Sequence, residues 1–178
     1  MKLQLKNVRL AFPALFTADS EFGKFGAQFI IDPNSPCIKE IEKAIDKVAK
    51  DKWGAKSETT LKAIKSGNKC CLYDGDSKAD YDGFAGNMAL SATNKTRPTL
   101  VNKDRSQVTE ADGVIYGGCY VNAIVEIWAQ DNQYGKRINA SLSGVQFVKD
   151  GEAFSGGGVA SADDFDDIEE GADAEDFV

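Results

Sequence analysis

The side chains of residues 113–130 alternate between two sets with very different chemistry. Tyr116, Tyr120 and Trp128 belong to one set, with a glycine between the two tyrosines. The other set is apolar or small and predicts a core face: Ile115, Gly117, Cys119, Val121, Ala123, Val125 and Ile127. A period of two is typical of a half-buried strand. Flat aromatic rings on the exposed face of such a strand could stack on unpaired nucleic-acid bases, at about 1–3 kcal/mol for each base.

Basic side chains in loops around this strand would suit the phosphates that accompany those bases. They are Lys95, Arg97, Lys103, Arg105, Lys136 and Arg137. Aromatic rings surrounded by cations predict an interface for a single strand of nucleic acid. The alternative is that each ring packs beneath a helix or a loop. The sequence leaves open which rings stack, and whether DNA or RNA is preferred.

Residues 35–54 have the pattern of a helix and add a second basic feature. Ser35 is a suitable N-cap, Pro36 suits the first helical position, and Gly54 is a suitable stop. Trp53 stands near the end of this segment among five lysines: Lys43, Lys47, Lys50, Lys52 and Lys56. These lysines could follow phosphates while Trp53 stacks on a base. A solvated helix face is the alternative interpretation of the same lysines.

The other patterns predict strands at 3–12, 27–31, 84–93 and 136–148, a short helix at 58–66 and a hairpin turn at 131–135. In the first strand, Val8, Leu10 and Phe12 are expected to share one face. We predict a mainly β fold with a helix inserted after the second strand. The architecture that fits is an OB-fold-like, five-stranded Greek-key barrel over residues 1–150, followed by a flexible, disordered acidic tail at 151–178. A β-sandwich fits the same pattern.

Negative charge is concentrated at the end of the chain. Nine of the 28 acidic residues lie in residues 160–178, which contain no Lys or Arg. The 19 that remain are balanced by 21 Lys and Arg, so the rest of the chain is slightly basic. A tethered acidic segment can compete with DNA for a cationic groove and recruit other proteins. For that second role we expect Asp173, Glu175, Asp176 and the apolar Phe177; a merely solubilising tail is the alternative.

Catalysis is disfavoured by composition. The chain has no histidine, which excludes Ser–His and Cys–His triads and histidine-bound metals. Its four cysteines match no zinc signature and are expected as reduced, mostly buried thiols. The loop from Asp74 to Asp82 gathers carboxylates, and a divalent-metal-dependent nucleic-acid enzyme built on it is one alternative, although Asp-Gly pairs mainly form turns. We predict no cofactor and no metal.

The body of the chain resembles a family of bacteriophage single-stranded-DNA-binding proteins, formerly of unknown function. The resemblance is carried, in order, by VRLAFPALF (8–16), KFGAQFIID (24–32), KWG (52–54), DGD (74–76), DGFAGNMALSATNKTRP (82–98), DGVIYGGCYVNAIVEIWAQDN (112–132) and SGVQFVKDGEAF (143–154). The tail resembles that of the helix-destabilising protein of phage T-seven. This resemblance implies an OB-type barrel that holds single-stranded DNA with little sequence preference, in phage replication or recombination.

The expected partners are therefore single-stranded DNA and, through the tail, replication or recombination proteins. A second alternative is a DNA-mimic or regulatory protein that acts only through its tail. No signal peptide or membrane-spanning stretch is visible, so we expect the protein in the cytoplasm of the host cell, without a membrane partner. The oligomeric state is left open, with a homodimer as one option.

Overall fold

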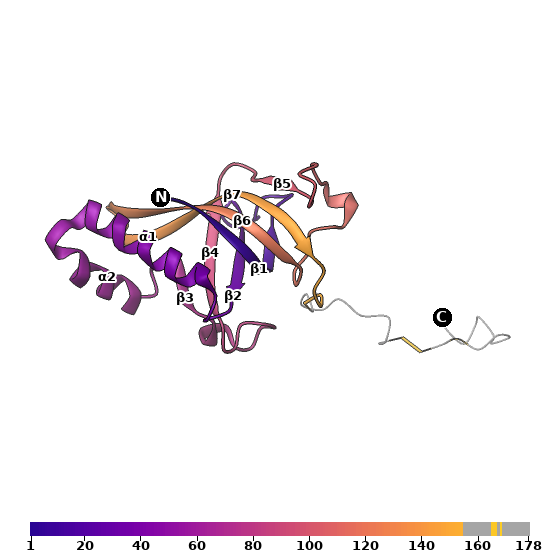
Figure 1. The fold of residues 1–178 in the computed structure, drawn as a ribbon, viewed down its shortest axis with the longest axis horizontal. Coiled ribbons are helices and arrows are strands. Elements are labelled where there is room, and N and C mark those ends of the chain that lie inside the picture. Colours follow the sequence, from indigo (N-terminus) through magenta and orange to yellow (C-terminus); the bar gives the residue numbers. More distant parts are fainter. Residues whose placement is uncertain (155–164, 167, 169–178) are drawn as a thin grey trace.

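The computed structural model describes residues 1–154, 165, 166 and 168. Its strands are β1 (Lys2–Ala14), β2 (Phe25–Ile31), β3 (Leu72–Asp74), β4 (Met88–Asn94), β5 (Thr99–Val101), β6 (Tyr120–Asn132) and β7 (Gly135–Lys149). The helices are α1 (Pro36–Trp53) and α2 (Ser57–Ser66), with 3₁₀ turns η1 (Gly54–Lys56), η2 (Gly75–Lys78) and η3 (Glu110–Asp112). In Figure 1 the two helices lie at one end of the strands, and β5 lies toward the other end.

Five strands close into a barrel. β1 pairs antiparallel with β2 and with β6, β2 pairs antiparallel with β4, and β6 forms a hairpin with β7. The ring closes through a parallel pairing of β4 with β7 at Thr93 and Ser141. This order, with a helical insertion after the second strand, is the Greek-key barrel of the OB type that the sequence predicted. β3 and β5 pair with the outer edges of β4 and β7.

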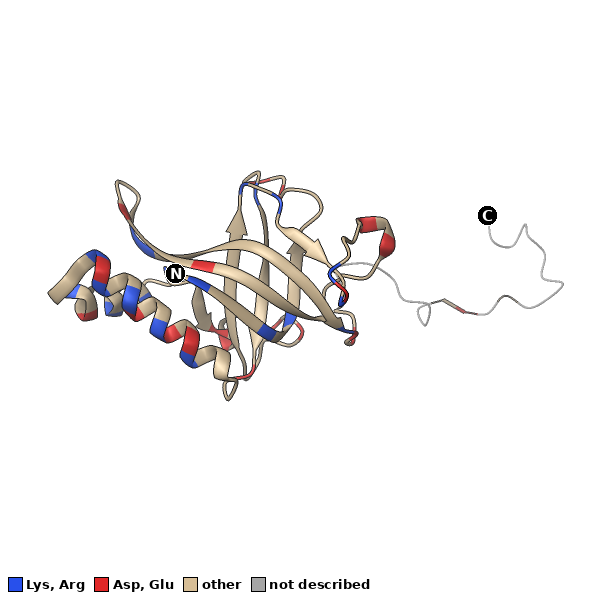
Figure 2. Cartoon of the chain, turned by 45° about the horizontal axis from the view of Figure 1, so that its top comes forward, with Lys and Arg blue, Asp and Glu red and all other residues tan. Residues whose placement is uncertain are grey.

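The helical insertion forms as the local sequence predicts. The Ser35 side chain accepts a hydrogen bond from the backbone N–H of Cys37, Pro36 opens α1, and Gly54 follows its last residue. The buried side of α1 includes Ile38, Ile41 and Ile45. Its exposed side carries both basic and acidic residues, which Figure 2 shows interleaved along the helix. In the described part of the chain, no helix is long and apolar enough to cross a membrane.

Three strand predictions need correction. The strand expected at 84–93 begins only at Met88, and residues 84–87 form a turn instead. Residues 113–119 are not part of the long strand, because β6 begins at Tyr120; Gly118, with φ of +109°, lies just before it. In β1, the pairing with β6 shifts register between Leu5 and Val8. A bulge of this kind lets two residues oppose one, so the simple alternation of faces breaks. Leu5 and Val8 are consequently both buried, although their spacing of three would place them on opposite faces.

Phe12 is the second departure from the expected alternation in β1. The β1–β2 register shifts again between Ala11 and Ala14, and Phe12 has a positive φ of +47°. Its side chain is 51% exposed, whereas the pattern placed it with the buried Val8 and Leu10. The expected core face of residues 115–127 is otherwise confirmed, since Ile115, Cys119, Val121, Ala123, Val125 and Ile127 are all buried.

Candidate nucleic-acid interface

A groove of about 1070 Å³ runs over the outer surface where β2, β4 and β7 meet. Its floor comes from the outward-facing positions of these strands, including Gln28, Ser91 and Ser141. These residues alternate with buried neighbours such as Phe29, Leu90 and Leu142, so the pleat that fills the core also turns polar side chains outward. In OB barrels this strand surface and its bordering loops form the usual ligand site.

Hydrogen bonds between side chains fix the polar floor of the groove. The hydroxyl of Tyr73 donates to Oε1 of Gln28 at 2.6 Å, and Nε2 of Gln28 donates to Oγ of Ser91 at 3.0 Å. Burial raises the pKa of Tyr73 to about 12, so its hydroxyl keeps its proton at neutral pH. A floor held in this way is organised before any ligand arrives.

The groove is electropositive. Lys24, Lys78, Lys95 and Arg137 line it, and no carboxylate is among the described residues that do so. Lys78 is half-buried, and its ammonium lies 5.1 Å from the centre of the Tyr73 ring. Burial lowers the pKa of Lys78 from its usual value. Charge of one sign within a groove attracts a polyanion more strongly than the same charge on a flat surface.

Three of the predicted site residues come together in this groove: Trp128 from β6, Arg137 from β7 and Lys95 from the connection after β4. The indole of Trp128 is 41% exposed, and its N–H donates to Oγ of Ser141 at 3.0 Å. This hydrogen bond satisfies the polar edge of the ring and leaves a face available for stacking. Lys136 precedes Arg137 on β7 but does not line the groove.

The two predicted tyrosines lie elsewhere. The Tyr116 hydroxyl donates to Oδ1 of Asp150 at 2.8 Å and also contacts the carbonyl of Gly151. Tyr120 begins β6, and its ring lies under the cations of Arg9 and Lys149, with 5.8 and 4.7 Å to the ring centre. Neither ring lines the groove, so Trp128 is the one of the three aromatic residues predicted in this stretch that does so.

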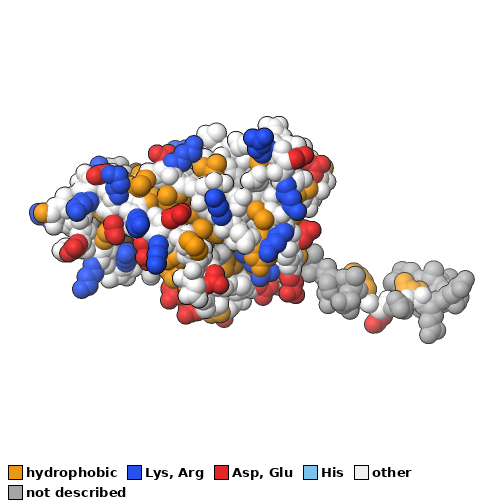
Figure 3. All heavy atoms as spheres, viewed as in Figure 1, with side chains coloured by type: hydrophobic (Ala, Val, Ile, Leu, Met, Phe, Trp, Pro, Cys, Tyr) orange, Lys and Arg blue, Asp and Glu red, His pale blue; other side chains and the backbone are white. Residues whose placement is uncertain are grey.

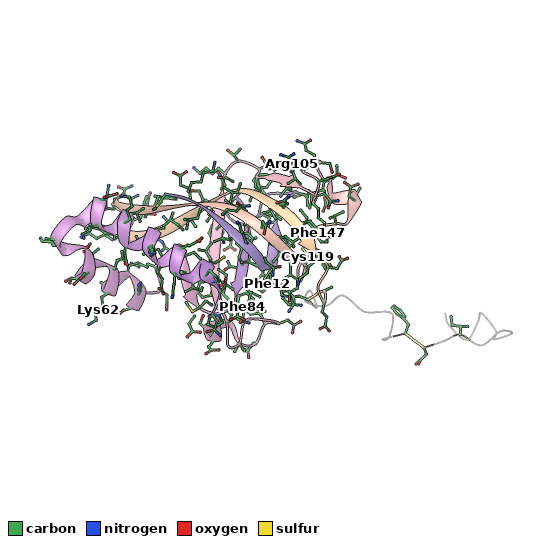
Figure 4. The ribbon with its side chains drawn as sticks, viewed as in Figure 1. Phe12, Lys62, Phe84, Arg105, Cys119 and Phe147 are labelled. Atoms are coloured by element: carbon green, nitrogen blue, oxygen red, sulfur yellow. The ribbon has the colours of Figure 1, made fainter. Side chains whose placement is uncertain are left out.

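The remaining predicted cations are dispersed as well. Nη2 of Arg97 donates to the carbonyl of Phe16 at 2.7 Å, which ties its loop to the β1–β2 connection. Lys103 lies over the ring of Phe147, with 5.7 Å from Nζ to the ring centre. Arg105 has a positive φ of +69° and belongs to the connection after β5, far from the helices in Figure 4.

Trp53 joins the helices to the barrel. Its indole N–H donates to Oδ2 of Asp131 at 2.9 Å, and its ring packs against the main core. None of the five lysines around it lines the groove, and Lys47 forms an ion pair with Asp51 on the exposed helix face. Figure 3 shows basic and acidic side chains interspersed over the face that carries α1. These contacts support the interpretation of a solvated helix face.

The acidic loop after β3 uses carboxylates to hold its own turns. Oδ1 of Asp74 accepts the backbone N–H of Asp76, and Oδ1 of Asp76 accepts that of Gly86. Across the described residues, no group of three His, Cys, Asp or Glu could hold a metal ion. The predicted partner-binding residues Asp173, Glu175, Asp176 and Phe177 lie outside the described part of the chain.

Several groove residues were missed from the sequence, chiefly Phe22, Lys24, Tyr73 and Lys78. Phe22 and Lys24 lie in the β1–β2 connection, where Oδ1 of Asp19 accepts the backbone N–H of Phe22 at 2.8 Å. The segment KFGAQFI (24–30) was the sequence signal for β2, because Gly26 and Gln28 alternate in it with apolar residues. Tyr73 and Lys78 had no local signal, because only the β3–β4 pairing brings their segment to the groove.

Comparison with protein families matches residues 1–178 to the family described as "Enterobacter phage Enc34, ssDNA-binding protein". This chain belongs to that family. Among curated proteins, the chain is 49% identical over 175 residues to protein p50 of Acyrthosiphon pisum secondary endosymbiont phage 1, with 94% of each chain covered.

Solved structures extend the family match to three dimensions. The single-stranded DNA-binding protein from bacteriophage Enc34 is 31% identical, with a TM-score of 0.74 over 93% of this chain and 90% of that one. Its complex with ssDNA matches at 30% identity and a TM-score of 0.72, over 86% and 89% of the two chains. The gp2.5 protein of bacteriophage T7 has 16% identity and a TM-score of 0.54, over 97% and 98%, which indicates a shared fold.

Proposed function

We propose that this chain binds single-stranded DNA without sequence preference, in phage replication or recombination inside the host cell. The proposal assigns it binding and no catalytic reaction. One observation carries the assignment to this molecule: a groove over β2, β4 and β7 combines four cations with the exposed ring of Trp128, and no carboxylate lines it among the residues that the structure describes. Bases stack on the aromatic rings while Lys and Arg bind the phosphates.

The groove residues have different roles in this proposal. Trp128 supplies the stacking face, and Tyr73 and Gln28 present fixed polar groups along the floor. Lys24, Lys78, Lys95 and Arg137 neutralise phosphates along the path. If all four do so, the logarithm of affinity falls against that of salt concentration with a slope of about −3.

The tail has two roles in this proposal. Its carboxylates compete with DNA for the groove at high effective concentration, and when displaced they bind replication or recombination proteins together with Phe177. Phe154 is the last residue of the described body, and its backbone N–H donates to the carbonyl of Gly117 at 3.0 Å. Asp163, the first carboxylate after Phe154, stands nine residues later in the sequence.

The first test is a titration of a fluorescein-labelled poly-dT oligonucleotide and of a duplex of equal length, followed by anisotropy at two salt concentrations. The full chain is compared with one that stops after Val159. We expect salt-sensitive binding with preference for the single strand, and tighter binding without the tail. Absence of binding by both chains at low salt would contradict the proposal. Sedimentation of the same samples distinguishes a monomer from a homodimer.

The position of the interface is tested by substitutions inside and outside the groove. Trp128→Ala is expected to weaken binding roughly 5- to 150-fold, which corresponds to the loss of one stacked base. Arg137→Ala is expected to reduce the salt slope by about 0.7. Lys103→Ala and Arg105→Ala serve as controls of equal charge change away from the groove, and their affinity should be nearly unchanged. Equal losses in both groups would move the interface elsewhere.

A further inference from the structure

The backbone of β1 is strained at an exposed aromatic residue. Phe12 has a φ of +47°, in the left-handed region that residues with a bulky side chain rarely adopt. The register shift between Ala11 and Ala14 accompanies this conformation and turns the ring out of the core, so that it is 51% exposed. A strained conformation costs of order 1–3 kcal/mol and persists where the surroundings enforce it, often at ligand sites.

Phe12 is held in an aromatic cluster that rests on the barrel. Its ring centre lies 5.8 Å from that of the buried Phe84 in a stacked arrangement, and 5.0 Å from that of Tyr81, edge to face. Figure 4 places Phe12 and Phe84 next to each other. The ammonium of Lys78 lies 6.0 Å from the centre of the Phe12 ring. One side of the Phe12 ring is thus supported while the rest of it is open.

A second cavity of about 420 Å³ lies beside this ring. Phe12 and Phe22, the latter 71% exposed, contribute aromatic surface to it, and Lys24 contributes a cation. Asp19 also lines the cavity, but its Oδ1 accepts the backbone N–H groups of Glu21 and Phe22. Phe22, Lys24, Gln28 and Thr93 line both cavities, so the second one continues the main groove across β2.

We propose that Phe12 and Phe22 form a second base-stacking subsite, which receives an unpaired base from the strand after it leaves the main groove past Gln28. This inference rests on the proposed function, because it extends the same bound strand. Three observations favour a nucleobase as the occupant: the two cavities are continuous, Lys24 lines both of them, and the strained backbone of Phe12 turns its ring outward, with the ammonium of Lys78 6.0 Å from the ring centre. Because of this subsite, an oligonucleotide long enough to reach both cavities binds more tightly than one that fills only the main groove.

A purely structural role for Phe12 predicts different behaviour on substitution. If the ring served only to cover Phe84, Phe12→Gly would expose that residue and lower the melting temperature. If the strain is maintained for binding, glycine adopts the positive φ without penalty and the melting temperature stays level or rises. Phe12→Leu separates stacking from coverage, because leucine covers apolar surface but offers no flat ring. Phe12→Trp preserves the stacking face.

The experiment measures anisotropy of labelled dT oligonucleotides of increasing length with the full chain and the three variants, alongside melting temperatures. For the longest oligonucleotide, Phe12→Gly and Phe12→Leu should bind roughly 5- to 150-fold more weakly than the unaltered chain, and Phe12→Trp should bind equally well. The shortest oligonucleotide that binds should show no difference. Unchanged affinity at every length, or equal losses at every length, would overturn the subsite. Failure of the unaltered chain to bind any oligonucleotide would instead refute the proposed function.

Discussion

At the scale of single residues, the adjacent cysteines Cys70 and Cys71 both line the groove, but the pKa values of their thiols are shifted in opposite directions. The hydrogen bond that Cys71 donates lowers the pKa of Cys70 to about 7, aided by the backbone N–H of Leu72 and the charge of Lys65, although burial opposes the shift. The same hydrogen bond, together with burial, raises the pKa of Cys71. Cys70 is half-buried, while Cys37, Cys71 and Cys119 are buried, in agreement with the prediction that the cysteines are mostly buried.

A disulfide reagent such as DTNB is therefore expected to react first with a single thiol, that of Cys70. Only the thiolate reacts, and its fraction rises as pH increases through about 7, so the rate should climb from pH 6 and level off above pH 8. Colour release measured by stopped flow gives the profile, and Cys70→Ser should abolish the fast phase. Bound poly-dT should slow it, since Cys70 lines the groove. A fast phase that survives in Cys70→Ser would refute this assignment.

At the scale of elements, the capping residues and apolar spacing in the local sequence determine where α1 forms. The extent of each strand depends instead on pairing with distant segments. Ser35 satisfies an N–H in the first turn of α1 that has no partner within the helix. The buried face of this helix packs on the core that β1 and β6 enclose, away from the groove. Helix stability and DNA binding are thus expected to be separable.

Ser35→Ala tests this separation. Loss of an N-cap side chain costs about 0.5–2 kcal/mol, so the free energy of unfolding should fall by roughly 1 kcal/mol. Urea unfolding followed by circular dichroism should show a lower midpoint with an unchanged m-value. Affinity for poly-dT should match that of the unaltered chain. A change in affinity larger than twofold at unchanged salt would show that the helix and the groove are coupled.

At the scale of the whole molecule, the segment 150–154 is strapped to the barrel before the tail begins. Nη2 of Arg9 donates to the carbonyl of Glu152 at 2.7 Å, and the guanidinium lies 4.3 Å from the centre of the Phe154 ring. The strap passes so close to Gly118 that a Cβ there would lie 2.2 Å from the carbonyl oxygen of Glu152. The start of the tail is therefore fixed relative to the groove.

Gly118→Ala is expected to displace this strap. The alanine meets both the positive φ of +109° and the Glu152 carbonyl, so the free energy of unfolding should fall by about 1–3 kcal/mol or more. Gly113→Ala is the matched control, because Gly113 has a φ of +64° but nothing lies within 4 Å of the added Cβ. Urea unfolding of both variants separates backbone strain from strap displacement. Equal losses in the two would mean that the strap contributes nothing.

The sequence by itself determined the elements whose signals are local. Caps and apolar spacing marked α1, the turn at 131–135 marked the β6–β7 hairpin, and alternation marked the buried face of β6. Order and spacing of the strands fitted both a five-stranded barrel and a β-sandwich, and the family resemblance favoured the barrel. Of the residues predicted for the interface, Trp128, Arg137 and Lys95 line the groove.

Only the tertiary structure decided which side chains share one surface. The closure of β4 on β7 and the addition of β3 bring Tyr73 and Lys78 beside Trp128, across long separations in sequence. The bulges in β1 reverse the expected direction of Phe12, and the late start of β6 at Tyr120 leaves Tyr116 outside the strand. Bulges and strand ends depend on pairing with distant partners. A periodic pattern read along one strand contains no information about those partners, and so it identified the core of this protein better than the side chains that line its groove.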